Sequence, residues 1–452
     1  MRETRQPMGF AAGLIRDAWE SVAHRGLDLL GKRFAHGPNT MAALCRDLLS
    51  ERGEASGAAL SRKAGELYAR LTPQDREAFF LSLLDRQFLP SHEAVLAAAD
   101  LYRAKPNSES LAQLFEAVEP PRQELFRRVN LAAGGTRLIV QIREDLLKLL
   151  PRHPELKPID TDLHHLLSSW FNRGFLRLER IDWRTPALVL EKLIEHESVH
   201  EIRGWDDLHR RLKADRRCFA FFHPALPDEP LIFVEVALTR GLPRSIQSLL
   251  HQDDGAIDPS RADTAVFYSI NNCLEGLRGV SFGNFLIKQV VAELELEKLP
   301  VRTFVTLSPI PGFRKWLLGL TEARRTELLG TGFDAFALKM AEAADAAKPT
   351  KALEPMRAVL LRLCAHYLIN ERKQDRAVDS VAAFHLGNGA AIEQLDWLAD
   401  TSEKGVKQSF GIMVNYAYRP WQIERNHEAY VKKGRIATSA RVKELLERPA
   451  EK

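Results

Sequence analysis

The sequence predicts an α+β protein of two domains, an all-helical bundle over residues 1–168 and a larger mixed domain over residues 169–452. Three observations lead to this prediction. The length of 452 residues corresponds to about two to four folding units. A content of 45 % apolar and 27 % charged residues is typical of globular chains. The spacing of apolar residues also changes near residue 168, from a helical period to short strand-like runs.

The first domain is predicted to be helical because its apolar residues recur every three or four positions. A helix start is visible at Thr72, whose hydroxyl can cap free N–H groups, with Pro73 at the first helical position. Similar apolar stripes cover residues 111–118, 124–131 and 138–150. A bundle without inward-facing polar groups is expected to serve interaction or oligomerisation.

The second domain contains three short runs that are predicted to be strands, at residues 231–238, 265–270 and 303–308. Between the last two lies a predicted helix at 284–296, whose apolar residues share one face. The order is therefore strand, glycine-containing loop, helix, strand. Residues 317–363 are expected to form a helical insertion.

Two further segments follow this insertion. Phe384-His385-Leu386 is predicted to lie on a strand, and a basic segment begins at Arg419. Residues 419–452 carry nine Lys or Arg against five Asp or Glu, an excess that equals the whole-chain charge of +4. We expect this segment to help attract a polyanionic ligand.

Composition excludes several classes of protein. A net charge of +4 over this length does not indicate a nucleic-acid binder. The four cysteines are far apart in sequence, which argues against a disulfide scaffold or a cysteine zinc site. No apolar run approaches the roughly 18 residues of a membrane span. The first thirty residues mix acidic and basic side chains, unlike a signal or transit peptide, so a cytoplasmic location is expected.

Residues His196 to His200 match the H-E-x-x-H pattern of zinc proteases. The pattern is short, and neither Gly204 nor His209 has the spacing of a third ligand. We therefore expect a solvent-exposed helix end here and no metal site.

Residues Gly279 to Gly283 match the G-x-S-x-G nucleophile elbow, which would make Ser281 a hydrolase nucleophile with His385 downstream. An elbow requires a strand that leads directly into the first glycine. Here the predicted strand ends near Ile270, eight residues earlier, so a serine hydrolase or thioesterase is only an alternative.

The same segment is better interpreted as a phosphate-binding loop between a strand and a helix. Its glycines allow the backbone to approach an anion, and the following helix start offers free N–H groups. Arg278 adds a charged donor. A plain structural turn is the competing interpretation. The loop comprises Arg278, Gly279, Val280, Ser281, Phe282, Gly283 and Asn284.

Four strings of the second domain resemble the malonyl-CoA decarboxylases, namely residues 267–270, 276–279, 283–288 and 307–316. The string Ser-Pro-Ile-Pro-Gly-Phe within the last of these is highly specific. The similarity extends back into the helical domain through residues 130–147 and covers most of the chain in order.

The resemblance implies a catalytic domain of the GNAT acyltransferase fold and a helical N-terminal domain that mediates self-association as a dimer or tetramer. It implies conversion of malonyl-CoA to acetyl-CoA and carbon dioxide, with the glycine loop on the CoA pyrophosphate. The family's catalytic serine and histidine correspond to Ser308 and His385. No cofactor or metal is expected, because the thioester itself accepts the electrons and coenzyme A is part of the substrate.

Other correspondences are weaker. Lys192 matches a functionally important lysine of the family, although a solvated lysine on a helix is the competing interpretation. Ser281 stands where relatives can carry a glutamate. Asn415, Tyr416 and Tyr418 are candidates for the substrate cavity or for simple packing. Two alternative functions remain, an acyl-CoA-dependent acyltransferase of the same fold and a helical scaffold with an inactive CoA-binding domain.

Overall fold

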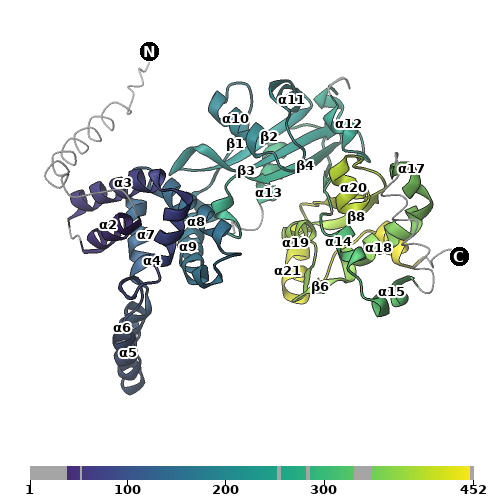
Figure 1. The fold of residues 1–452 in the computed structure, drawn as a ribbon. Coiled ribbons are helices and arrows are strands. Elements are labelled where there is room, and N and C mark those ends of the chain that lie inside the picture. Colours follow the sequence, from purple (N-terminus) through teal and green to yellow (C-terminus); the bar gives the residue numbers. More distant parts are fainter. Residues whose placement is uncertain (1–37, 51–52, 252–255, 281–285, 330–348, 448–452) are drawn as a thin grey trace, which may run out of the picture. The chain divides into compact units, whose positions relative to one another are not determined.

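The computed structural model describes residues 38–50, 53–251, 256–280, 286–329 and 349–447. Within them the chain forms two compact units (Figure 1). One unit is helical, and the other contains a mixed sheet with helices around it. The helical unit comprises the described residues up to Phe175, together with Pro224–Pro227 and the described part of Leu274–Ser281.

The predicted helices of the first unit are confirmed. Thr72 is the N-cap of the third of them, and its side chain accepts a hydrogen bond from the Asp75 N–H at 3.2 Å, as the sequence predicted. Apolar faces such as that of residues 135–149 pack inward. The helices are α2 (Pro38–Ser50), α3 (Glu54–Arg70), α4 (Pro73–Ser82), α5 (His92–Ala104), α6 (Ser108–Val118), α7 (Pro121–Leu131), α8 (Gly135–Leu149) and α9 (Lys157–Trp170).

Helices α5 and α6 pack against each other as a hairpin that projects from the rest of the helical unit (Figure 1). Its apolar side chains are unusually exposed, and no residue of α5 is buried. Phe115 is 67 % exposed and Leu96 is 53 % exposed. The hairpin therefore presents an apolar surface in the single chain.

The second unit is built on a sheet of seven described strands in the order β1-β2-β3-β4-β5-β9-β8. Strands β4 and β5 are parallel, and the pairs β1–β2, β3–β4, β5–β9 and β8–β9 are antiparallel. The predicted strands are confirmed with slightly different ends. Their bounds are β1 (Arg177–Ile181), β2 (Arg216–His223), β3 (Leu226–Thr239), β4 (Thr264–Asn272), β5 (Thr303–Thr306), β8 (Ala391–Asp396) and β9 (Met413–Ala417).

The two parallel strands separate toward their carboxyl ends. Their register runs from Thr264 opposite Thr303 to Phe267 opposite Thr306, and the Leu307 N–H still reaches the Phe267 carbonyl at 3.0 Å. Beyond this point β4 continues along β3 to Asn272, whereas the chain after β5 pairs with β9. The sheet thus opens between β4 and the end of β5.

Helices of the second unit surround this sheet (Figure 1). The described part of the predicted insertion is mainly helical, and the mixed sheet with flanking helices agrees with the α+β, GNAT-type domain expected. The helices are α10 (Ala187–His196), α11 (Trp205–Arg211), α12 (Gln247–Leu250), α13 (Leu286–Leu296), α14 (Phe313–Leu318), α15 (Glu322–Leu329), α17 (Pro349–Leu353), α18 (Arg357–Asn370), α19 (Ser380–Gly387), α20 (Glu403–Ser409), α21 (Ile423–Lys433) and α22 (Ala440–Glu447). A two-stranded sheet joins β6 (Arg372–Lys373) to β7 (Arg376–Ala377).

One predicted element is wrong. Phe384, His385 and Leu386 lie on helix α19 and not on a strand. The helix begins because the Asp379 side chain caps it, accepting hydrogen bonds from the Val381 and Ala382 N–H groups at 3.0 Å. With only eight residues, the helix is too short for its period to outweigh the apolar run in the sequence.

Candidate active site

Ser308 lies two residues after the end of β5, where the chain turns away from β4. Its backbone N–H and C=O both pair with Val414 of β9 at 2.9 Å, which fixes the strand end. Alternate residues of a strand share one face, so Thr306 and Ser308 point the same way. The Ser308 hydroxyl donates to Thr306 Oγ1 at 2.8 Å, and the Tyr416 N–H donates to the same oxygen at 3.1 Å.

His385 approaches Ser308 from helix α19. Its Nε2 lies 3.1 Å from Ser308 Oγ, and its Nδ1 lies 2.8 Å from the Tyr418 hydroxyl. The ring of Tyr416 stacks on the imidazole, with centroids 4.6 Å apart and planes inclined by 24°. Ser308 and His385 are 5 % and 3 % exposed. The sequence-predicted serine and histidine, 77 positions apart, therefore form a hydrogen-bonded pair.

Each ring nitrogen of His385 has one hydroxyl partner, Ser308 at Nε2 and Tyr418 at Nδ1. A neutral imidazole carries one N–H, so one nitrogen donates to its partner and the other accepts. Burial lowers the pKa of His385 to about 3, so the ring is neutral around pH 7. Burial also raises the pKa of Tyr418, which keeps that phenol protonated.

A cavity of about 240 Å³ reaches this pair. It lies where the sheet opens, because its walls come from β4, from the residues after β5 and from α19. The polar side chains of the wall besides the pair are those of Ser269, Asn272 and Ser380. The apolar ones are Val199, Ile232, Phe267, Ile270, Pro309, Val381 and Phe384, together with the amphipathic Tyr268.

Asn415, Tyr416 and Tyr418 lie behind the pair and are absent from the lining of this cavity. Asn415 is fully buried and donates from Nδ2 to the Thr306 carbonyl at 2.7 Å. The two tyrosines contact His385 directly. Sequence reasoning missed Thr306, although its position two residues before Ser308 on a strand was a usable signal.

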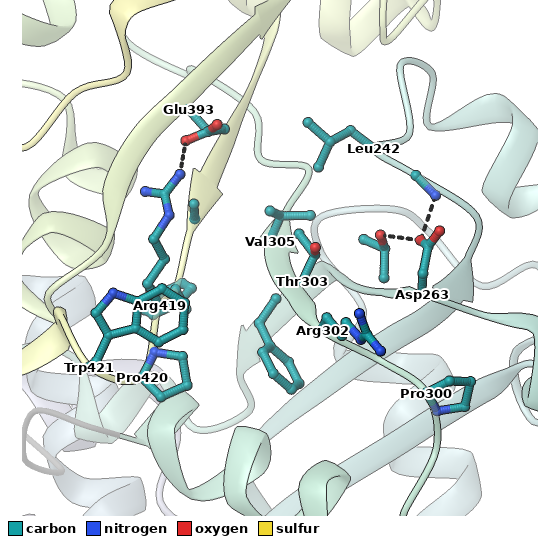
Figure 2. Close-up of a pocket in the computed structure, with 15 residues that line it drawn as sticks. Leu242, Asp263, Pro300, Arg302, Thr303, Val305, Glu393, Arg419, Pro420 and Trp421 are labelled. Atoms are coloured by element: carbon teal, nitrogen blue, oxygen red, sulfur yellow. Dashed lines mark hydrogen bonds and ion pairs between the residues drawn. The ribbon is translucent and has the colours of Figure 1, made fainter.

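Tyr418 also borders a second, larger hollow of about 740 Å³ at the other end of β5 (Figure 2). Arg419 there donates to Glu393 at 2.7 Å, and Trp421 and Pro420 lie beside it. Neither Ser308 nor His385 lines this hollow. The smaller cavity is therefore the candidate active site, since it alone of the two reaches the pair.

Lys192 is not the solvated lysine that the sequence suggested. Its ammonium group pairs with Glu229 at 2.5 Å and donates to the Asp228 carbonyl at 3.0 Å, and the side chain is 14 % exposed. Lys192 is thus part of a half-buried ion pair that ties α10 to β3, and it is absent from the cavity lining.

The H-E-x-x-H segment also differs from expectation. Helix α10 ends at His196, so the two histidines do not share a helical face. Glu197 and His200 are buried, which corrects the predicted solvent-exposed helix end. The Glu197 carboxylate accepts hydrogen bonds from Ser269 and Asn271 at 2.6 and 2.9 Å and therefore holds this segment on β4. No group of three or more His, Cys, Asp or Glu suited to a metal occurs among the described residues.

The predicted phosphate loop is described only in its first part. Arg278, Gly279 and Val280 follow a short 3₁₀ turn at Glu275–Leu277, and Ser281 to Asn284 lie outside the described residues. Gly279 has a φ of +81°, a conformation that favours glycine. Strand β4 ends at Asn272 and does not lead directly into Gly279, as expected against a nucleophile elbow.

Comparison with known proteins gives consistent matches. Residues 174–452 match the malonyl-CoA decarboxylase C-terminal domain, and residues 88–171 match the N-terminal domain of the same family. A mitochondrial malonyl-CoA decarboxylase from Anser anser anser is 36 % identical over 406 residues, which span 83 % of this chain and 81 % of that one. One from Rattus norvegicus is 35 % identical over 413 residues, with coverage of 84 % and 83 %.

Solved structures agree with these matches. The crystal structure of a malonyl-CoA decarboxylase from Rhodopseudomonas palustris is 46 % identical, with a TM-score of 0.84 over 91 % of this chain and 100 % of that one. That of a malonyl-CoA decarboxylase from Agrobacterium vitis is also 46 % identical, with a TM-score of 0.81 over 90 % and 99 %. From its two domain matches and these relatives, the chain belongs to the malonyl-CoA decarboxylase family.

Proposed function

We propose that this protein decarboxylates malonyl-CoA to acetyl-CoA and carbon dioxide, and that Ser308 and His385 are its catalytic residues. The observation that carries the assignment of the residues is their hydrogen bond, 3.1 Å long, at the wall of a largely apolar cavity. Family membership supports the reaction itself.

The chemistry requires two things of the site. Loss of carbon dioxide leaves an electron pair on the thioester, as an enolate, so donors must face its oxygen. A proton must then reach the carbon that carried the carboxylate. An enolate carbon is a much stronger base than imidazole, so the Ser308 hydroxyl and the N–H of the neutral His385 imidazole are adequate acids for it. Solvent replaces the single proton that each turnover consumes.

An apolar cavity also favours the reaction because it is a poor solvent for the carboxylate. The negative charge of the starting carboxylate is localised on its two oxygens. Carbon dioxide is neutral, and the charge of the enolate is delocalised over the thioester. The apolar wall of the cavity therefore disfavours the ground state more than the transition state.

The decisive assay follows the loss of malonyl-CoA and the formation of acetyl-CoA by the purified protein without any acyl acceptor. Ser308→Ala and His385→Asn are each expected to lower kcat by roughly 10²–10⁴. His366→Asn is the matched control, because His366 lies on α18, bound to Glu371 and away from the cavity. Product formation only after addition of an amine or alcohol would instead identify an acyltransferase, and near-normal turnover in both variants would remove the pair from the mechanism.

We propose that no metal or other cofactor takes part, because the thioester accepts the electrons. Turnover should persist unchanged after dialysis against a chelator. Loss of activity that a divalent cation restores would contradict this.

The loop Arg278–Asn284 is proposed to bind the CoA pyrophosphate. The Arg278 guanidinium is 64 % exposed, which supports this role, and a phosphate would replace its exposed partner Glu275, now 3.6 Å away. Arg278→Ala is expected to raise KM for malonyl-CoA about tenfold, the equivalent of about 1.4 kcal/mol, with little change in kcat. Arg184→Ala, which removes an exposed arginine paired with Asp182, should leave KM unchanged.

Self-association through the helical domain, as a dimer or tetramer, is also proposed. The α5–α6 hairpin supports it, since Leu96 and Phe115 expose apolar surface that a soluble monomer rarely keeps free. Phe115→Asp should lower the mass measured by sedimentation or light scattering. Leu296→Asp, at an exposed leucine on α13, should not.

A cytoplasmic location likewise remains a proposal from the sequence. No helix among the described residues is long and apolar enough to cross a bilayer. The relatives from Anser anser anser and Rattus norvegicus are described as mitochondrial. Imaging of the full chain in its own cells would decide the location.

A further inference from the structure

Asp379 joins the two segments that carry Ser308 and His385. It is 2 % exposed and immediately precedes α19. Its Oδ1 accepts hydrogen bonds from the Val381 and Ala382 N–H groups, both at 3.0 Å, and thereby caps the helix that carries His385. This oxygen fixes where α19 begins, in the turn and a half before the catalytic imidazole.

The second oxygen of the same carboxylate reaches the other segment. Asp379 Oδ2 accepts the Gly312 N–H at 3.2 Å, and the Tyr367 hydroxyl lies 3.5 Å away. Gly312 follows Ser308 closely, just beyond Pro309 and Pro311, so the short connection is stiff. A Cβ at Gly312 would lie 2.2 Å from the Tyr367 hydroxyl, so only glycine allows this approach.

Helix capping alone does not require a buried carboxylate, because serine or asparagine caps equally well. Burial raises the pKa of Asp379, which means that keeping its carboxylate ionised in the fold costs free energy. Within the described part of the chain it forms no ion pair, and the titratable groups near it are Cys364 and Tyr367 of α18 and Tyr416 of β9. What the carboxylate adds over a simple cap is a second acceptor, directed at Gly312.

We propose that Asp379 is a positioning residue that sets the contact between Ser308 and His385 by holding the Gly312 turn and the start of α19 on one carboxylate. The inference rests on the proposed role of that pair in decarboxylation. Displacement of a catalytic group by about 1 Å can cost about 10²-fold in rate. Loss of the hydrogen bonds that Asp379 accepts from Gly312 and from the start of α19 should therefore lower kcat. The residues that line the cavity are unchanged, so substrate binding should be kept.

The test compares Asp379→Ser, which can still cap α19 but is too short to reach Gly312, with Asp379→Asn, which keeps one acceptor oxygen at nearly equal volume. Asp379→Ser is expected to lower kcat by roughly 10- to 100-fold, with KM within about threefold of the wild type. The kcat of Asp379→Asn should lie between those of the wild type and Asp379→Ser. Ser402→Ala is the control, because Ser402 caps α20 through the Gly405 N–H at 3.0 Å and does not line the cavity.

Two readouts separate positioning from a general loss of stability. In the Ser308→Ala background, Asp379→Ser should lower kcat by a smaller factor than in the wild type, since the Ser308–His385 contact that Asp379 sets is already gone. If kcat of the double variant fell by the product of the two single factors, the proposal would be overturned. A wild-type kcat in Asp379→Ser would overturn it as well.

The second readout does not depend on activity. A crystal structure of Asp379→Ser should show that Ser308 Oγ and His385 Nε2 have moved beyond hydrogen-bond reach, and an unchanged 3.1 Å contact would overturn the proposal. If the wild-type protein failed to decarboxylate malonyl-CoA, the proposed function would fall, and this distance would still decide the role of Asp379.

Discussion

At the scale of single residues, the neutral state of His385 has a thermodynamic consequence. The unfolded chain binds a proton on this histidine below about pH 6.5, whereas burial keeps the folded pKa near 3. The contribution of His385 to stability is therefore complete above pH 6.5 and is lost as the pH falls from 6.5 toward 3. His200, with a pKa lowered to about 4 by burial, acts with the same sign.

The expected outcome is a weaker acid dependence of unfolding in His385→Gln. The wild-type urea midpoint should fall between about pH 7.5 and about pH 5, and the variant should lose less, because its glutamine does not titrate. Parallel curves for the two proteins would show that His385 has the same pKa in the folded and the unfolded chain, and would contradict the prediction. His366→Gln should change the acid dependence in the same direction, because burial also lowers the pKa of that imidazole.

The pairing of Ser308 with His385 was predictable from the sequence only through the family resemblance. By composition alone His385 was one of 14 histidines, and nothing linked it to a serine far earlier in the chain. The residues that contact or position the two side chains were not predicted to do so. Asp379 looked like an ordinary residue, and the contact of Tyr418 with the imidazole depends on how β9 packs beside α19.

At the scale of elements, two glycines at the end of α19 show how tightly the helix that carries His385 is packed. Gly389 has a φ of +83°, and a Cβ there would lie 2.1 Å from the Ile423 carbonyl oxygen of α21. A Cβ added at Gly387, the last residue of α19, would meet no atom within 4 Å. The two glycines therefore differ sharply in the space around them.

Gly389→Ala is expected to destabilise the protein by about 3 kcal/mol or more, since it combines backbone strain with a clash. Gly387→Ala should be neutral or stabilising by up to about 1 kcal/mol, because alanine is the better helix former. Urea unfolding of both variants measures the contrast. Equal stability of the two would mean that the turn after α19 adapts without cost.

The long periodic elements were predicted well and the short ones poorly, for a physical reason. Helices such as α8 show several turns of an apolar stripe, and β3 to β5 are bounded by clear polar segments. Helix α19 has only about two turns, and its start depends on a side-chain cap that is local and easily overlooked. The separation of β4 from β5 is a tertiary feature without any local signal.

At the scale of the whole molecule, the basic C-terminal segment is folded over residues 419–447 and is not a loose tail. Helices α21 and α22 pack on α19, α18 and β8, and Arg419 pairs with Glu393. Truncation would remove part of the fold, so it cannot test the proposed attraction of the CoA nucleotide. Exposed charges on these helices offer a cleaner test.

Replacing Arg425, Lys433 and Lys443 by glutamine should lower kcat/KM for malonyl-CoA at low salt and flatten its dependence on ionic strength, with kcat unchanged. Stopped-flow binding of a CoA analogue across a salt series measures the association rate directly. If the slope against salt matched that of the wild type, the segment would have no steering role.

The hydrogen bond between Ser308 and His385 places both groups side by side in the cavity lining, which also has a stereochemical consequence. A proton delivered from a fixed donor pair reaches only one face of a planar enolate. Protonation should therefore be enantioselective at carbon, even though the acetyl product conceals it, since a methyl group with three equal hydrogens has no handedness. The chirality of the site would become visible only with a substrate whose carbon ends with three different substituents besides the thioester carbonyl.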